Sequence, residues 1–97
     1  MIIVHDIFVC KPGNASKVAK MFKEAMMSDP HSVNIMTDVT GQYNRVIMVW
    51  QYENLTAYEQ SWEAMKNPTK EVQEAMKKME GYQDMYLTGS REIYRTW

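Results

Sequence analysis

The sequence contains few of the residues that build disulfides, metal sites and flexible linkers. Its 97 residues include one cysteine, two histidines, four glycines and three prolines. The single cysteine, Cys10, excludes an internal disulfide and any CxxC metal or redox motif, and we expect it to be a small buried residue at the end of a strand. His31 follows Pro30 in an expected loop, so we interpret it as a solvated surface residue. No segment has the length and polarity of a disordered region, and we expect one domain over residues 1–97.

Neither positive nor negative charge is in excess. Eleven Lys and Arg against twelve Asp and Glu give a formal net charge of -1. No basic run is present that could neutralise a row of phosphates, so nucleic acid is not an expected partner. The N-terminal segment 1–10 lacks the positive flank of a signal peptide and is shorter than the ~20 apolar residues that span a bilayer. We therefore expect a cytoplasmic protein with no membrane partner.

Apolar residues recur with strand and helix periods along the whole chain. Helical spacing of three and four predicts helices over 15–27, 55–65 and 68–81, the last two being either separate helices or one kinked helix. We expect Asn14 and Asn54 to cap the first two helices, and Asn67 to cap the third with Pro68 as its first residue. Alternating apolar residues rich in β-branched and aromatic types predict strands over 2–10, 32–38, 45–52 and 82–97. Gly89 is expected to mark a bulge or bend in the last strand.

The order strand, helix, strand, strand, helix pair, strand is the βαββαβ pattern of ferredoxin-like α+β folds, with an antiparallel four-stranded sheet. In that topology the first and third strands lie in the middle of the sheet. Both of these strands are apolar on both alternating faces, whereas one layer of helices covers only one face. The uncovered face therefore predicts a homodimer in which a second copy closes over it.

The chain resembles the dimeric α+β barrel superfamily, which includes NIPSNAP-like proteins and antibiotic biosynthesis monooxygenases. The similarity is carried by RVIMVWQYENL, by the following helix with Trp62, by a second helix after Asn67 and Pro68, and by the terminal SREIYRTW. The resemblance implies a dimeric α+β barrel of ferredoxin-like topology.

Haem-degrading monooxygenases of the same superfamily use an asparagine in the first strand, a tryptophan after the third strand and a downstream histidine that ligates iron. Here Asp6 lies near the position of that asparagine, and residues 72–78 contain no histidine. Trp62 is the one match. Haem oxygenation is therefore not carried over, and we expect no cofactor.

His5 and Asp6 are the residues that we consider for proton transfer. They adjoin on the first strand and so point to opposite faces, which excludes a local acid–base pair. Asp6 is either a general base or the ion-pair partner of Arg45, Arg91 or Arg95. His5 is either a proton acceptor or a hydrogen-bonded interior histidine. It has no companions at metal-ligand spacing, so no metal site is expected.

Trp50, Tyr58, Trp62 and the nine internal methionines could line an apolar pocket between sheet and helices, or could be ordinary core. Arg91 and Arg95 share one side of the last strand if the register holds. They could clamp a ligand carboxylate or form a salt bridge across the dimer.

Two functions fit these observations. The first is a noncatalytic dimer that binds a small apolar molecule or another protein. The second is a cofactor-independent monooxygenase- or isomerase-like enzyme, with Asp6 or His5 as proton acceptor and Trp62 in the pocket wall. The sequence has no nucleophile triad, phosphate loop or metal cluster, which favours the first. It leaves open whether the protein is an enzyme.

Overall fold

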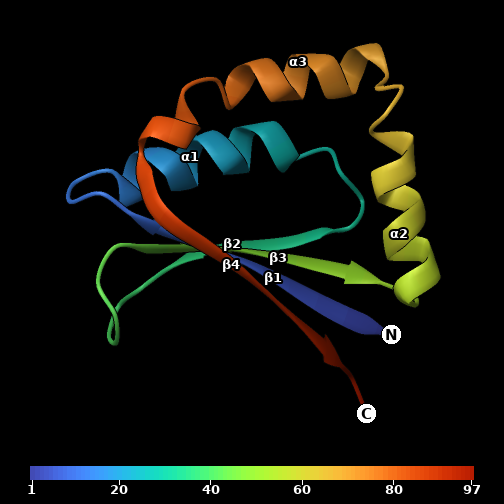
Figure 1. The fold of residues 1–97 in the computed structure, drawn as a ribbon, viewed down its shortest axis with the longest axis horizontal. Helices are drawn as coiled ribbons and strands as arrows, with labels where there is room; N and C mark the ends of the chain where they lie inside the picture. Colours follow the sequence, from blue (N-terminus) through green and yellow to red (C-terminus); the bar gives the residue numbers. More distant parts are fainter.

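The computed structural model describes residues 1–97 and consists of one four-stranded sheet with its helices (Figure 1). In chain order the elements are β1 (Ile2–Cys10), α1 (Ala15–Met26), β2 (Ser32–Thr37), β3 (Arg45–Tyr52), α2 (Leu55–Ala64), α3 (Lys70–Lys78), the 3₁₀ helix η1 (Tyr82–Asp84) and β4 (Tyr86–Arg95). The predicted α+β fold of ferredoxin-like topology is confirmed.

All strand pairs of the sheet are antiparallel, and the strand order is β2-β3-β1-β4. β1 and β3 are therefore the central strands, as their apolar faces predict. β1 pairs along nearly its whole length with both neighbours, and Ile2 lies opposite Tyr52 on β3 and opposite Arg95 on β4. The same register places Asp6 directly opposite Arg91.

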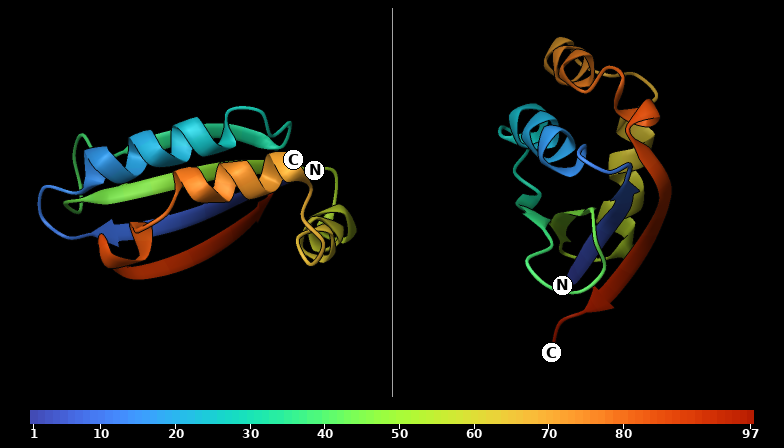
Figure 2. Two further views of the ribbon diagram at one scale, coloured as in Figure 1. Left: turned by 90° about the horizontal axis from the view of Figure 1, so that it is seen from above. Right: turned by 90° about the vertical axis from the view of Figure 1, so that its left-hand side faces the viewer.

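The helices α1 and α3 run side by side over one face of the sheet, and α2 stands across their direction at one end of the sheet (Figures 1 and 2). Between α1 and the sheet lies the main core, in which Val18 and Phe22 of α1 are at most 1% exposed. Its strand residues are Cys10, Val46 and Met48. The expectation that Cys10 is buried is confirmed. By contrast, α2 contains no buried residue.

The opposite face of the sheet is covered by no element of this chain (Figure 2). We call it the open face. The strand register gives it an apolar centre, with polar side chains from the edge strand β4 beside it. The apolar side chains of the two central strands on this face are Ile3, Ile7, Val9, Ile47 and Val49.

The helix starts differ in part from the predictions. Asn54 caps α2 as expected, because its side chain accepts a hydrogen bond from the Ala57 amide at 2.8 Å. Asn14 occupies the cap position of α1 but forms no side-chain cap bond. The predicted Asn67 cap is wrong. α3 starts at Lys70 and is capped by Thr69, whose side chain accepts a hydrogen bond from the Val72 amide, while the Asn67 amide still bonds to Ala64 in the preceding helical turn.

The last strand is shorter than predicted. Gly81 adopts a left-handed backbone conformation with φ 88°, and Tyr82 then begins the short helix η1 instead of a strand. Tyr82 packs edge-on against Phe8 and Phe22 in the core, at ring-centre distances of 6.1 and 5.3 Å, and this packing favours the helical turn. The bulge predicted at Gly89 is also wrong. The register shift lies at Leu87, and Gly89 pairs regularly.

Candidate functional site

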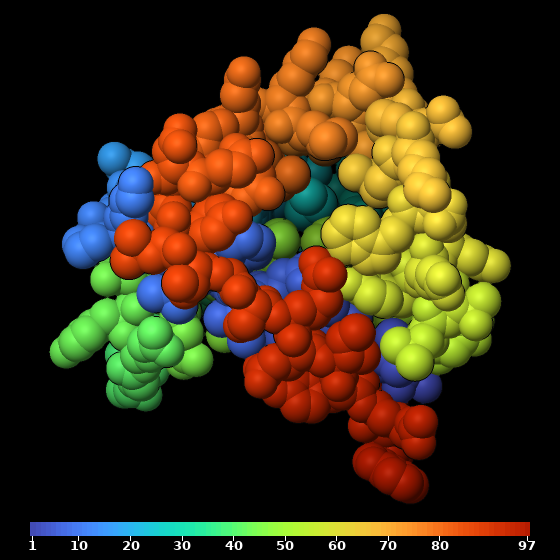
Figure 3. Space-filling model, in the orientation of Figure 1, coloured from blue at the N-terminus to red at the C-terminus, as the bar shows by residue number.

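A cavity of about 430 Å³ lies between the sheet and the helices. Figure 3 shows its mouth as a hollow ringed by α3, α2 and β4, with atoms of α1, β1 and β3 at its floor. Two thirds of the lining residues, 14 of 21, are hydrophobic. They include five methionines from three helical segments and one strand, namely Met26, Met48, Met65, Met76 and Met79. The cavity therefore offers a flexible apolar lining of the kind that adapts to irregular ligands.

One end of the cavity holds a network of polar side chains centred on Asp6. Arg91 donates from Nε to Asp6 Oδ1 at 2.5 Å, and Trp50 donates from Nε1 to Asp6 Oδ2 at 3.1 Å. The pairing follows from the strand register, since Arg91 and Trp50 flank Asp6 on the same face of the sheet. Asp6 is therefore the ion-pair partner of Arg91, one of the arginines expected for it.

The guanidinium of Arg91 also lies against two aromatic rings of α2. Its Cζ atom is 5.0 Å from the Trp62 ring centre and 6.0 Å from that of Tyr58, which are cation–π distances. Burial alone lowers the pKa of Arg91, but the hydrogen bond and the negative charge of Asp6 outweigh that effect, so this pKa is raised. Arg91 therefore stays charged while it links β4, β1 and α2.

The tyrosines beside this network lie in a largely enclosed setting. Tyr52 is 6% exposed, and burial raises its pKa. Its ring meets that of Tyr58 edge-on at 5.1 Å, and Tyr58 in turn meets Trp62 at 6.3 Å. The Tyr58 hydroxyl is buried and has no hydrogen-bond partner. Such a group carries a desolvation cost that a suitable partner would remove.

Residues 6–91 of the chain match the family model of NIPSNAP. The chain belongs to the NIPSNAP family. Solved structures agree with this assignment at the level of the fold. A NIPSNAP domain protein from Burkholderia xenovorans has a TM-score of 0.78 and 11% identity, covering 100% of this chain and 95% of that one.

A second protein from Burkholderia xenovorans, with a NIPSNAP-like domain, has a TM-score of 0.77 and 18% identity, covering 99% of this chain and 84% of its own. A candidate antibiotic biosynthesis monooxygenase from Deinococcus radiodurans has a TM-score of 0.61 and 13% identity, covering 100% of this chain and 93% of its own. Both resembled groups, NIPSNAP and antibiotic biosynthesis monooxygenases, are thus among the structural neighbours. No curated protein sequence matches the chain.

The structure brings most of the predicted site residues of this NIPSNAP protein into one place. The cavity lining includes all of Asp6, Trp50, Tyr58, Trp62 and Arg91. The remaining two lie elsewhere.

His5 points to the open face, as the strand alternation requires, where its ring meets Tyr94 edge-on at 5.3 Å. Arg95 is exposed near the end of β4, opposite Ile2, and is not part of the lining. Arg91 and Arg95 share a side of the strand, but they do not meet in the cavity as a carboxylate clamp.

Several lining residues were not singled out by the sequence. Ser61 could have been found, because it lies one helical turn after Tyr58 on the same stripe of α2. Asp29, in the loop after α1, and Glu71, on α3, carried no such signal. Both line the cavity, and Glu71 does so from α3, which lies alongside α1 over the sheet.

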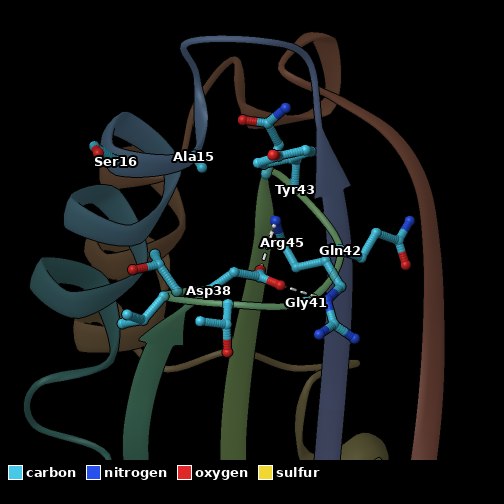
Figure 4. Close-up of a pocket in the computed structure, with 11 residues that line it drawn as sticks. Ala15, Ser16, Asp38, Gly41, Gln42, Tyr43 and Arg45 are labelled. Carbon is cyan, nitrogen blue, oxygen red and sulfur yellow. Dashed lines mark hydrogen bonds and ion pairs between the residues drawn. The ribbon is translucent and has the colours of Figure 1, made fainter.

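A second cavity, of about 500 Å³, lies at the β2–β3 loop (Figure 4). Only three of its 11 lining residues are hydrophobic. Its charged side chains pair with each other, since Arg45 donates from Nε to Asp38 Oδ2 at 2.9 Å. This cavity offers no apolar body and no unpaired charge for a ligand, so the methionine-lined cavity is the candidate site.

The described residues contain no group of three or more His, Cys, Asp or Glu placed to hold a metal ion. No helix has both the length and the apolar character needed to cross a membrane.

Proposed function

We propose that this NIPSNAP protein binds a small apolar molecule in the cavity between its sheet and its helices. The observation that carries the proposal is the lining itself. Five methionines and the aromatic rings of Trp50, Tyr58 and Trp62 surround about 430 Å³ of space, and one end bears a few converging polar groups. Ligand sites have this character, being concave and mostly apolar with few polar contacts.

We also propose that the binding unit is a homodimer closed across the open face. Four of the five apolar side chains of β1 and β3 on that face, Ile3, Ile7, Val9 and Ile47, remain partly exposed in the single chain, whereas Val49 is already buried. A second copy related by a two-fold axis would bury the same surface on both partners. The candidate site lies on the other side of the sheet, so dimer formation leaves its mouth free.

A catalytic role has one observation in its favour, which is that Asp6 lines the cavity. The carboxylate is the only acidic group bonded to the polar network there. Both of its oxygens accept hydrogen bonds, from Arg91 and Trp50, so proton transfer to Asp6 would disturb this network. Some structural neighbours are named as candidate antibiotic biosynthesis monooxygenases, which keeps a cofactor-independent monooxygenase or isomerase as the second function.

The proposal is tested by titrating the protein with 2-acetylnaphthalene and following tryptophan fluorescence. Trp50 and Trp62 line the cavity, so a bound naphthyl ring is expected to quench both. The variant Ala75→Trp places a large side chain in the lining and is expected to abolish saturable quenching.

The matched control is Glu74→Trp, one residue earlier on α3 and outside the lining. It is expected to bind the probe like the unmodified protein. Saturable binding that survives Ala75→Trp unchanged would place the ligand elsewhere, and the absence of saturable binding to the unmodified protein would contradict the proposal.

A further inference from the structure

The charges around the cavity restrict the kind of ligand it can take. The lining holds one cationic side chain, Arg91, and three carboxylates, Asp6, Asp29 and Glu71. Arg91 is already paired with Asp6 at 2.5 Å, so its positive charge is compensated within the wall. A ligand carboxylate would therefore face no unpaired cation and two further negative groups. Such an arrangement penalises a buried anion.

The same wall nevertheless has hydrogen-bond donors that donate to no protein acceptor. Arg91 has five N–H groups, of which only the Nε group donates to a protein acceptor in the structure. The Tyr58 hydroxyl has no partner at all. Asp6, by contrast, accepts on both oxygens. The polar end of the cavity thus has unused donors next to an occupied acceptor.

The guanidinium of Arg91 lies over the ring of Tyr58. The Cζ atom of Arg91 is 6.0 Å from the Tyr58 ring centre, and the hydroxyl of Tyr58 is screened from solvent. A ligand oxygen reaches that hydroxyl only if a neighbouring side chain moves. Arg91 is suited to this because it lies over the Tyr58 ring and 43% of its side chain is exposed, whereas the Asp6 side chain is only 14% exposed.

We infer that the ligand is an uncharged apolar molecule with an oxygen acceptor, such as a ketone, that accepts hydrogen bonds from Arg91 and Tyr58. This inference rests on the proposed function. It further specifies that Asp6 acts as a selectivity residue, because its charge compensates Arg91 and disfavours carboxylic acids. Trp62, against which Arg91 packs at 5.0 Å, supplies a flat apolar wall at the same end.

The test compares four probes that differ in one substituent, namely 2-acetylnaphthalene, 2-ethylnaphthalene, 2-naphthoate and 2-(aminomethyl)naphthalene. The ketone is expected to bind about tenfold more tightly than the ethyl compound, as one or two hydrogen bonds would give. Naphthoate is expected to bind more weakly than either. Tightest binding of naphthoate or of the amine, or equal binding of ketone and ethyl compound, would overturn the inference while leaving the proposed function in place.

Two variants examine the compensating charge of Asp6. Asp6→Asn leaves Arg91 without its counter-charge, so affinity for naphthoate is expected to rise about tenfold relative to the ketone. Glu71→Gln removes one negative charge from the lining without touching Arg91 and is the matched control, expected to change that ratio less than about threefold. An equal change in both variants would overturn the selectivity role of Asp6.

Tyr58→Phe removes only the unpartnered hydroxyl and does not depend on the folding of the Asp6 variant. It is expected to weaken binding of the ketone about three- to tenfold and to leave the ethyl compound unchanged. An unchanged ketone affinity would show that the Tyr58 hydroxyl does not donate to the ligand. If none of the four probes binds saturably to the unmodified protein, the proposed function fails and the inference fails with it.

Discussion

The guanidinium of Arg91 lies between Asp6 on the neighbouring strand and the ring of Trp62 on α2, 2.5 Å from the carboxylate and 5.0 Å from the ring centre. The edge strand β4 thereby contacts a helix that contains no buried residue of its own. This link is built from a charge pair and a cation–π contact, and its contribution to stability can be measured.

Replacing Arg91 by Met keeps most of the apolar stem but removes the charge. The loss of the Asp6 hydrogen bond and of the cation–π contact is expected to lower the free energy of unfolding by about 1 to 2 kcal/mol, discounted for the exposure of Arg91. Urea denaturation measures the difference. As a control, Glu63→Gln breaks the pair of Glu63 and Lys66, whose side chains are 63% and 70% exposed, and should have almost no effect. Equal losses in the two variants would show that the Arg91 contacts contribute no more to stability than an exposed ion pair does.

Truncation of Trp62 distinguishes a cavity wall from a packed core. Trp62 is 48% exposed, so Trp62→Ala is expected to cost about 1 to 2 kcal/mol, well below the 3 to 5 kcal/mol of a core aromatic. Phe22, a residue of α1 that is 1% exposed in the core, is the reference, and Phe22→Ala should show the full loss. Chemical denaturation of both variants gives the comparison. A core-sized loss for Trp62→Ala would mean that the cavity is closed in solution.

The unpartnered hydroxyl of Tyr58 predicts an unusual stability effect. Tyr58→Phe removes a buried group that has no hydrogen bond, so the free energy of unfolding is expected to stay constant or to rise by up to about 1 kcal/mol. Tyr43→Phe, at a position 85% exposed, should be neutral. The melting temperatures of the two variants provide the measurement. A clear destabilisation by Tyr58→Phe alone would show that the hydroxyl has a partner in solution.

A charge in the middle of the open face is expected to separate the dimer. Ile7 lies opposite Ile47 on the two central strands, and Ile7→Lys would place an ammonium group in the proposed interface. Sedimentation equilibrium at micromolar concentration should give the dimer mass for the unmodified protein and the monomer mass for this variant. Leu55→Lys, at a position 58% exposed at the start of α2, should remain a dimer. A monomeric unmodified protein would contradict the proposed assembly.

Stability is expected to fall on the alkaline side. Burial raises the pKa of Cys10 from its ordinary value of 9.0 and that of Tyr52 from 10.0. The folded state therefore holds these protons more tightly than the unfolded state, so the free energy of unfolding decreases as pH rises above about 9. Denaturation midpoints between pH 7 and pH 11 test the sign. In Cys10→Ala the decline should begin about one pH unit higher, where Tyr52 begins to contribute, and the same onset in both proteins would exclude Cys10 as the cause.

The sequence predicted those parts of the fold that depend on local periodicity. The apolar alternation on both faces of β1 and β3 predicted their central places, and the cap at Asn54 follows from a local hydrogen bond. The errors arose where tertiary packing decided. The residue types from Tyr82 onward predicted a strand. However, the Tyr82 ring packs against Phe8 and Phe22, and the chain there forms a short helix.

The candidate site likewise combines features that follow from local spacing with features that depend on long-range pairing. The aromatic stripe of α2 could be read from spacing, and Asp6 could be assigned an arginine partner because a central-strand carboxylate needs one. Which arginine it would be depended on the register of β1 and β4, a long-range pairing that a single sequence does not encode locally. Arg91 lies directly opposite Asp6, whereas Arg95 lies opposite Ile2 and outside the cavity.

The absence of buried residues in α2 also bears on the rates of hydrogen exchange. Elements with little buried apolar surface open locally at a lower free energy than the global unfolding of the molecule. The amides of α2 are therefore expected to exchange with solvent deuterium through local opening, while those of β1 and β3 exchange only when the whole domain unfolds. Each such opening would detach one wall of the cavity, so a ligand could enter and leave far more often than the protein unfolds.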